Sequence, residues 1–194
     1  LDKVIFKPVS KVYRSLPSPI KTGTSNVVNN LSNLVTVPNN ILQGDYRTAG
    51  KNTVRLLINS TVGVLGLFDV ASAAGFSDYQ KEDYGQTLGA WGVGEGCYVV
   101  LPILGPSTVR DATGSLISML GGDPWYNITV ANDTQYVNEA DYYVSRVSSA
   151  VDFRAKNIDS FNNLEKNSID FYASVKSLYL QDRQQKILNV RKII

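Results

Sequence analysis

Few side chains in this sequence could carry out covalent chemistry. The 194 residues contain no histidine, and Cys97 is the one cysteine. Without histidine, the Ser–His–Asp and Cys–His arrangements that activate most hydrolytic nucleophiles cannot form. Zinc sites also lose their commonest ligand, and a single thiolate cannot build such a site alone. We therefore predict a protein that is not an enzyme and that binds no metal and no cofactor.

Two other patterns could suggest chemistry, and both have a plainer explanation. The segment GVGEG at 92–96 is similar to a phosphate-binding loop, but no Lys-Ser or Lys-Thr pair follows it and no clear strand precedes it. Two acidic pairs could act as acid and base, namely Glu82 with Asp83 and Glu139 with Asp141. Acids on a solvated helix surface are far commoner, so we expect these carboxylates to lie in water.

The spacing of apolar residues predicts a mainly α-helical fold that positions whatever site exists. Strand signals are few, and the best of them is the stretch 97–101. A helix is expected to start at Ser18, and a separate short turn is expected over 36–44. The carboxylate of Asp45 can cap the next helix. Ser107 is expected to cap a later helix that runs to about Leu120, and the final stretch, 181–192, has the pattern of a solvated helix end.

The chain as a whole has the composition of one globular domain with little net charge. No repeat or linker divides it, so we expect a single domain over 1–194. A formal net charge of +2 gives no electrostatic case for binding nucleic acid. The chain begins at Leu1 and its one methionine is Met119, so the natural start is absent. A signal segment and a lipid-bearing cysteine could precede Leu1.

The most unusual segment is the glycine-rich, apolar centre at 84–109, in which Glu95 is the one charged side chain. A buried core explains such a segment about as well as a lipid-facing surface does. Core segments usually keep a regular period, however, whereas glycine and proline interrupt this one throughout. Trp91 and Tyr98 also favour the boundary between water and lipid. We expect a membrane-facing or channel-lining surface made by Trp91, Val93, Tyr98, Val99, Leu101, Ile103 and Leu104.

Small residues accompany this surface. Gly92, Gly94 and Gly96 would allow a tight backbone path through the centre. The stretch 62–76 is small and apolar, and we expect it to continue the preceding helix and to pack beside the centre. Its larger side chains are expected to face lipid as well, namely Leu65, Leu67 and Phe68. No run reaches the roughly 18–20 apolar residues that a helix needs to span a bilayer.

Several segments resemble the MlaA/VacJ lipoprotein family, in the family's order. The first are FKPV at 6–9, LPSPI at 16–20, VPNNILQG at 37–44, RLLINSTVG at 55–63 and GLFDVA at 66–71. The centre carries the most specific likeness, with YGQTLG at 84–89, WGVGEGCYVVLP at 91–102 and LGPSTVRD at 104–111. YLQDR at 179–183 resembles the closing helix, and Cys97 stands where the family usually has proline. The resemblance therefore covers nearly the whole chain.

This resemblance implies an α-helical, ring-like lipoprotein in the inner leaflet of a Gram-negative outer membrane, on the periplasmic face. Such proteins form an amphipathic channel through which phospholipids misplaced in the outer leaflet pass to a periplasmic carrier. The implied partners are phospholipid, a trimeric porin and a soluble periplasmic lipid-carrier protein. A second hypothesis stays open from the residues alone, namely a periplasmic scaffold or adaptor that binds envelope proteins through the polar C-terminal helices and simply buries its apolar centre.

Overall fold

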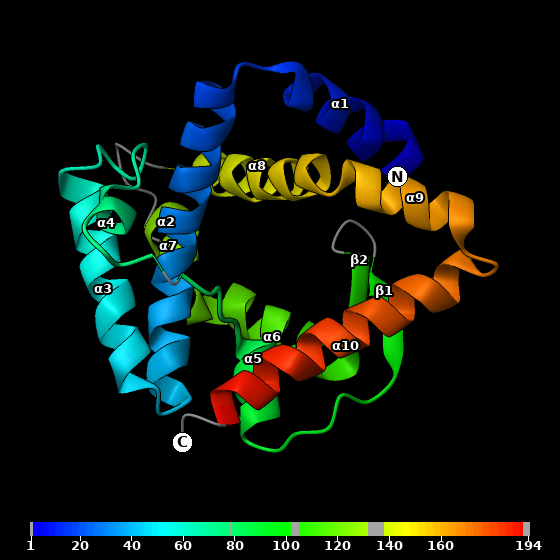
Figure 1. Cartoon of the computed structure of the whole chain (residues 1–194). Coiled ribbons are helices and arrows are strands. Elements are labelled where there is room, and N and C mark those ends of the chain that lie inside the picture. The colour runs from blue at the N-terminus through cyan, green and yellow to red at the C-terminus, as the bar shows by residue number, and fades with distance from the viewer. Residues whose placement is uncertain (1, 78, 102–104, 132–137, 192–194) are drawn as a thin grey trace.

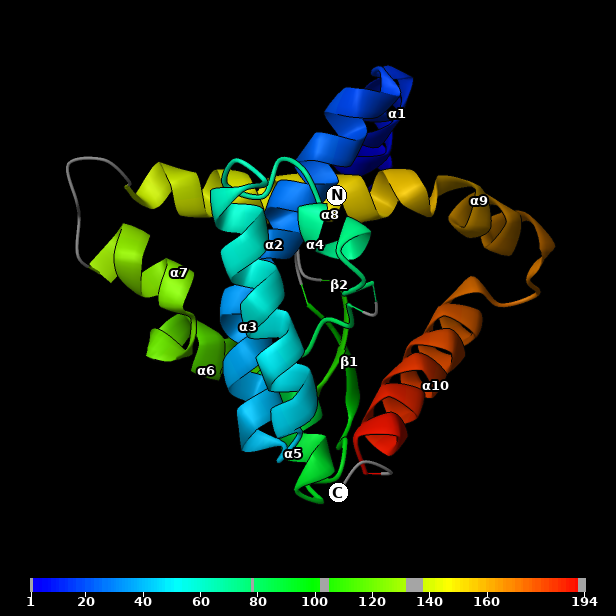
Figure 2. The ribbon, with the colours of Figure 1, turned by 60° about the vertical axis from the view of Figure 1, so that its left-hand side comes forward.

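The computed structural model describes residues 2–77, 79–101, 105–131 and 138–191. Helices dominate these residues and follow one another around a central opening (Figure 1). The expected mainly helical fold is confirmed. Figure 2 shows the molecule turned by 60°, with an upright pair of helices near the middle of the view and the last helix sloping down one side.

Most of the described elements are short, and four of the helices have 16 residues or more. In order, the helices are α1 (Lys7–Ser15), α2 (Ser18–Leu42), α3 (Tyr46–Thr61), α4 (Val70–Ala73), α5 (Tyr84–Ala90), α6 (Val109–Ile117), α7 (Pro124–Tyr126), α8 (Glu139–Lys156), α9 (Ile158–Asn167) and α10 (Phe171–Arg191). Short π-helical turns lie at Asp2–Phe6, Ser118–Gly122 and Asn127–Ala131. The strands β1 (Tyr98–Leu101) and β2 (Gly105–Thr108) pair antiparallel, with Tyr98 opposite Thr108.

Helices α2 and α3 form the upright pair and are the two longest helices of the N-terminal half. The expected start at Ser18 is confirmed. The separate turn expected over 36–44 is wrong, because α2 continues through Pro38 to Leu42 and loses only the backbone hydrogen bond that proline cannot donate. The expected cap at Asp45 is confirmed, since its carboxylate accepts from the backbone N–H of Thr48 at 3.0 Å.

The contact between α2 and α3 is polar. Asn52 Nδ2 donates to Asn40 Oδ1 at 2.9 Å, and Asn30 Nδ2 donates to Ser60 Oγ at the same distance. The largest fully buried side chains of the described residues are all polar: Gln43, Gln86, Asn33, Asn39, Asn52, Thr36, Thr87, Thr108, Thr129, Asp123 and Ser10. Most soluble domains bury large apolar groups instead, so the usual distribution of polar and apolar side chains is inverted in this molecule.

The stretch 62–76 does not continue α3, and the expectation that it would is wrong. The chain turns after Thr61 and resumes a helix only at α4. Close packing of the turn on itself explains the change, because a Cβ on Gly63 would lie 2.3 Å from the carbonyl oxygen of Phe68. Asn26 of α2 also holds this turn in place, because its Nδ2 donates to the carbonyl of Leu67 at 3.1 Å.

The centre contains the hairpin of β1 and β2 between two short helices. The strand expected at 97–101 is confirmed within one residue. The cap expected at Ser107 is wrong by one residue, because the hydroxyl of Thr108 accepts from the backbone N–H of Asp111 at 3.2 Å. Helix α6 also ends at Ile117, where a π-helical turn replaces the expected α-helical continuation to Leu120.

The C-terminal helix α10 closes the ring by packing on α5. A Cβ on Gly89 would lie 2.4 Å from Ile187 Cδ1, and one on Gly85 would lie 2.7 Å from Arg183 Nη2. Two glycines one turn apart therefore give α5 a flat face on which α10 lies. The expectation that 181–192 is a solvated helix end is wrong at Arg183 and Ile187, which are both buried.

Gly114 offers a test of the crossing between α5 and α6. A Cβ there would lie 2.3 Å from the backbone nitrogen of Gly85, whereas a Cβ on Gly50 of α3 would meet open space. We expect Gly114→Ala to lower the free energy of unfolding by about 2 kcal/mol, the size typical of overpacking. Gly50→Ala is the control, and it should raise that free energy by up to about 1 kcal/mol, because alanine favours a helix. Urea unfolding in mild detergent measures both, and equal effects would contradict the close crossing.

Candidate functional site: an apolar exterior around a charged opening

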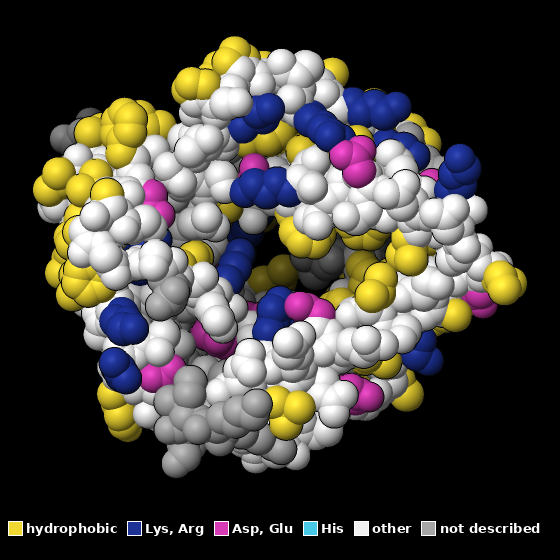
Figure 3. Space-filling view, viewed as in Figure 1, with side chains coloured by type: hydrophobic (Ala, Val, Ile, Leu, Met, Phe, Trp, Pro, Cys, Tyr) yellow, Lys and Arg dark blue, Asp and Glu magenta, His cyan; other side chains and the backbone are white. Residues whose placement is uncertain are grey.

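Apolar side chains gather on the outside of this inverted molecule. Along α3 and the turn after it the exposed ones are Tyr46, Val54, Leu57, Val62, Val64, Leu65, Leu67 and Phe68. Helix α8 adds Tyr143, Val144, Val147 and Phe153, and the N-terminal helix adds Val9 and Val12. Figure 3 shows apolar groups along the outer edge of the ring beside α3. An exposed apolar surface of this extent marks an interaction with a membrane or a partner.

The turn after α3 holds its apolar side chains outward at the cost of backbone strain. Val64 and Leu65 have φ of 52° and 55°, in the left-handed region that β-branched and bulky residues avoid. Each such residue costs of order 1–3 kcal/mol and persists only where the surroundings enforce it. Leu65 is nonetheless 76% exposed. Strain without burial points to a surface that is stabilised by something outside the chain.

Three of the expected lipid-facing residues therefore lie together. Leu65, Leu67 and Phe68 are all exposed on this turn. Trp91 and Val93 are exposed at the far end of α5, where Trp91 Nε1 donates to the carbonyl of Leu42 at 2.9 Å. The structure thus splits the expected surface into two regions. Ile103 and Leu104 lie outside the described residues.

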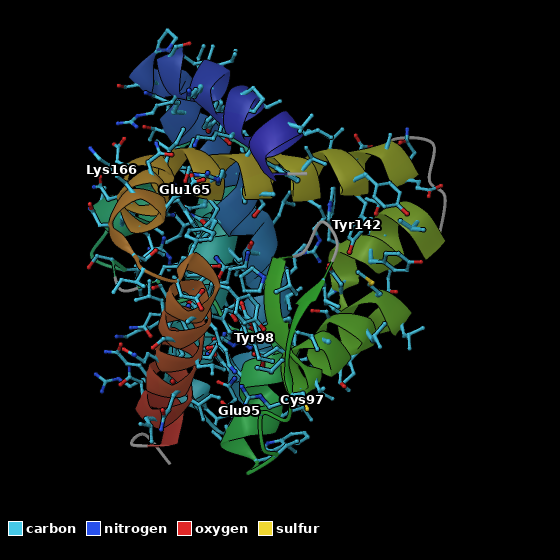
Figure 4. All side chains as sticks on the ribbon, turned by 90° about the vertical axis from the view of Figure 1, so that its right-hand side faces the viewer. Glu95, Cys97, Tyr98, Tyr142, Glu165 and Lys166 are labelled. Atoms are coloured by element: carbon cyan, nitrogen blue, oxygen red, sulfur yellow. The ribbon has the colours of Figure 1, made fainter. Side chains whose placement is uncertain are left out.

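The hairpin divides the rest of the expected surface between two faces. Tyr98 packs edge-on against Tyr172 and Tyr179 of α10, with ring centroids 5.6 and 6.1 Å apart. Figure 4 shows Tyr98 on the side of the hairpin nearer α10. Successive strand residues point to opposite faces, so Val99 and Leu101 share the other face. Both are partly exposed.

The three central glycines are not equivalent. Gly92 and Gly96 have φ of 93° and 67°, a conformation that favours glycine. Gly96 also lies where a Cβ would approach Val109 to 3.1 Å. At Gly94 φ is not in the left-handed region and a Cβ would meet open space, so the structure gives no reason for glycine there.

Arg183 makes the densest set of ionic contacts in the described residues. Its Nη1 and Nη2 donate to the two oxygens of Asp83 at 2.7 and 2.8 Å, and its Nε and Nη2 donate to those of Asp111 at 3.0 and 2.8 Å. Tyr179 Oη donates to Asp111 at 2.7 Å, and Arg110 Nε donates to it at 3.1 Å. Arg110 and Asp111 therefore form an ion pair at the start of α6.

The electrostatics of this cluster follow from burial and pairing. Burial alone would raise the pKa of Asp83, but the guanidinium of Arg183 lowers it to about 2. Burial alone would also raise the pKa of Asp111, which Arg183 and Tyr179 hold below its ordinary value. The pKa of Arg183 is raised, because its hydrogen bonds to Asp83 and Asp111 outweigh the effect of burial. The cluster stays fully charged at neutral pH.

Glu82 behaves in the opposite way, and the expectation that it lies in water is wrong. Its side chain is 7% exposed, and burial raises its pKa to about 7. Gln43 Nε2 donates to Glu82 Oε2 at 3.2 Å, and the backbone N–H of Glu82 donates to Thr36 Oγ1 at 3.3 Å. The other expected pair, Glu139 and Asp141, is exposed at the start of α8, as predicted.

Lys81 lies directly before the buried Glu82, in the segment that leads to α5. Its side chain is exposed, yet loss of hydration lowers its pKa, and Arg146 lowers it further. The ring of helices leaves a central opening (Figure 3). Figure 3 shows this opening with charged side chains on part of its wall and apolar ones on the rest. Within the described ranges, no three His, Cys, Asp or Glu side chains gather as a metal site needs.

The comparison with known families gives a clear result. The family model described as MlaA lipoprotein matches residues 1–186. The chain belongs to this family. The intermembrane phospholipid transport system lipoprotein MlaA of Haemophilus influenzae is 30% identical over 96% of this chain and 72% of its own length. The lipoprotein of the same name from Escherichia coli is 31% identical over 93% of this chain and 69% of its own length.

A solved structure supports the same membership within the MlaA family. It is described as the structural basis for maintenance of bacterial outer membrane lipid asymmetry. It matches this chain with a TM-score of 0.79 and 30% identity, over 96% of this chain and 89% of that one. An uncharacterized protein of Rickettsia prowazekii is also similar, at 33% identity over 96% of this chain and 71% of its own length.

Sequence reasoning missed the Arg183 cluster. Asp83 was grouped with solvated acids, and Arg183 was placed on a solvated helix end, because each has polar neighbours in sequence. Asp83 and Arg183 lie 100 residues apart in the sequence, so no local pattern connects them. The one available signal is that Asp111 and Arg183 each end a segment that carries the MlaA resemblance.

Arg183→Met should loosen α10 from α5. Removing Arg183 takes two hydrogen bonds from the buried Asp111, which keeps only Arg110 as counter-charge, and leaves Asp83 unpaired. We therefore expect the free energy of unfolding to fall by about 3 kcal/mol. Lys186→Met is the matched control, because its pair with Asp182 on the same helix is exposed and is worth about 0.5 kcal/mol at most. Urea unfolding measures both variants. Similar losses in the two would show that Arg183 does not hold the ring closed.

Glu82 predicts a pH dependence of stability. Its pKa of about 7 in the folded protein exceeds the ordinary 4.5, so the folded state holds the proton more tightly. Stability should therefore fall as pH rises from about 4.5 to about 7. Glu82→Gln keeps a neutral side chain throughout, so it should be the more stable protein at about pH 8, by up to about 3 kcal/mol, and should lose that advantage near pH 5.

Urea unfolding at both pH values checks this prediction. Glu95→Gln removes an exposed charge from the same region and reveals any general effect of net charge. A wild-type stability that rises between about pH 5 and about pH 8, with no gain in Glu82→Gln, would count against a neutral Glu82.

Proposed function

We propose that this chain is a phospholipid-transport component that maintains lipid asymmetry in an outer membrane. The observation that carries this function is the inverted molecule, in which an apolar exterior surrounds a partly charged opening. Acyl chains gain about 0.8 kcal/mol for each methylene group taken from water, and the positively charged side chains beside the opening (Figure 3) suit a phosphate headgroup. The names of the two MlaA relatives support the same function.

The same apolar surface suggests how the protein lies in the membrane. None of the helices in the described ranges is both long and apolar enough to cross a membrane. The apolar turn after α3 and the exposed face of α3 suit insertion into one leaflet, with the chain in the plane of that leaflet. We place the protein in the outer membrane, on its periplasmic face, with a lipid anchor. The unit that acts there is a single domain over 1–194.

The finer features of the proposal concern partners and surfaces. The partners are a trimeric porin and a soluble periplasmic lipid carrier, and no covalent step is involved. The lipid-facing residues are Leu65, Leu67 and Phe68 on the turn and Trp91 and Val93 at the end of α5. Val99 and Leu101 line the path on the face of the hairpin opposite Tyr98.

The test is the phospholipid that copurifies when the protein is extracted from membranes in mild detergent. Mass spectrometry should detect phospholipid on the wild type, and Val99→Asp should lower the amount several-fold, because a carboxylate on the path repels headgroup and acyl chain alike. Val100→Asp is the matched control, since Val100 is 57% exposed on the opposite face of the same strand. Circular dichroism verifies that both variants keep their helices.

Two outcomes bear on the proposal. Equal losses in Val99→Asp and Val100→Asp would contradict the path along the hairpin but not lipid binding itself. Wild-type protein that leaves the membrane without detergent and carries no lipid would overturn the proposed function. That result would favour the adaptor hypothesis, in which partner proteins bind the C-terminal helices.

A further inference from the structure

A small polar cavity lies between α2 and α3. Its volume is about 10 Å³, and its wall includes Asn30 and Asn33 of α2, Arg55 of α3 and Tyr79. Tyr79 is held in place there, because its hydroxyl lies 3.3 Å from the carbonyl oxygen of Asn29, to which it donates. The ring of Tyr79 also lies 5.5 Å from the guanidinium carbon of Arg55. The cavity is therefore closed by well-positioned groups.

Three polar atoms of the side chains that line it have no hydrogen-bond partner among the described groups. They are Asn30 Oδ1, Asn33 Oδ1 and Arg55 Nε, and each is shielded from bulk water. The three side chains are 5%, 2% and 5% exposed. A buried polar group without a partner is strongly disfavoured, so three around one cavity call for an explanation.

Rotating the side chains of Asn30 and Arg55 does not remove the problem. Asn30 already donates from Nδ2 to Ser60 Oγ at 2.9 Å, so turning its amide would lose that bond. Arg55 Nη2 lies 3.1 Å from both carboxylate oxygens of Asp69, and Nη1 donates to Ser72 Oγ at 3.1 Å. These contacts fix the guanidinium plane and with it the direction of the Nε–H bond.

We propose that one internal water molecule binds in this cavity and joins α2 to α3. The water donates its two hydrogens to Asn30 Oδ1 and Asn33 Oδ1 and accepts the Nε–H of Arg55. The cavity volume corresponds to the smallest space that holds a single water, and three polar partners are the usual number for a buried one. Two acceptors with one donor match water and no simpler ligand.

Other occupants fit less well. A metal cation would accept the two amide oxygens as ligands, but it would face the positive charge of Arg55 and leave the Nε–H without an acceptor. An apolar group would satisfy none of the three atoms. The inference goes beyond the proposed function and does not depend on it, because the three atoms are buried whether or not lipid covers α3.

A crystal structure at a resolution that shows ordered water tests the proposal on the wild-type protein. We expect a density peak within hydrogen-bond distance of Asn30 Oδ1, Asn33 Oδ1 and Arg55 Nε. Absence of that peak, or amides turned so that the three groups bond one another directly, would overturn the proposal. A peak with the shorter contacts and higher coordination of a metal ion would overturn it as well.

Two variants at one position then test the assigned partner. Asn33→Asp keeps an acceptor of the same size, so the water should remain. Asn33→Leu removes the acceptor and fills the space, so the peak should be lost, and a peak that persists unchanged would overturn the role of Asn33. Should Asn33→Leu fail to fold, a nuclear Overhauser effect between water and the Arg55 Nε–H in the wild type decides the same question, and its absence would count against bound water.

Discussion

The four hydrogen bonds from Arg183 to Asp83 and Asp111 join segments 100 and 72 residues apart in the sequence. Helix α10 reaches the rest of the ring mainly through this contact and the glycine face of α5 beneath it. Tyr172 and Tyr179 of the same helix also pack against Tyr98 of the hairpin. The opening that gives the protein its proposed function therefore depends on a charge cluster in which Arg183 and Asp111 are buried.

The polar interior and the apolar exterior both follow from the need of polar groups for hydrogen-bond partners inside the molecule. Surfaces that face lipid offer no hydrogen bonds, so polar groups must find partners inside the molecule. The asparagines between α2 and α3 meet this demand by bonding across the pair, as Asn52 does with Asn40. With its interior occupied by amides, α3 is free to expose Leu57 and the residues of the following turn. The polar contact between α2 and α3 and the apolar exterior of α3 therefore depend on each other.

Local signals in the sequence predicted local structure well. The start of α2 at Ser18, the cap at Asp45 and the strand near 97–101 each depend on neighbouring residues, and all three are confirmed. Long-range packing explains the failures. Pro38 does not end α2, the stretch 62–76 turns back on Gly63, and Arg183 is buried by partners that no sequence window contains. The lipid-facing residues were predicted as one surface, but strand alternation places Tyr98 and Val99 on opposite faces.

The ring is closed at its two ends by joints of different physical character. Between α1 and α9, Arg14 pairs with Asp159 through side chains that are 49% and 68% exposed. At α10, Arg183 and Asp111 are only 9% and 6% exposed. Mobile ions screen charges in contact with solvent far more than charges within the protein. Ionic strength should thus act on one joint alone, so that a salt-rich medium softens the ring beside α1 while its closure on α5 stays rigid.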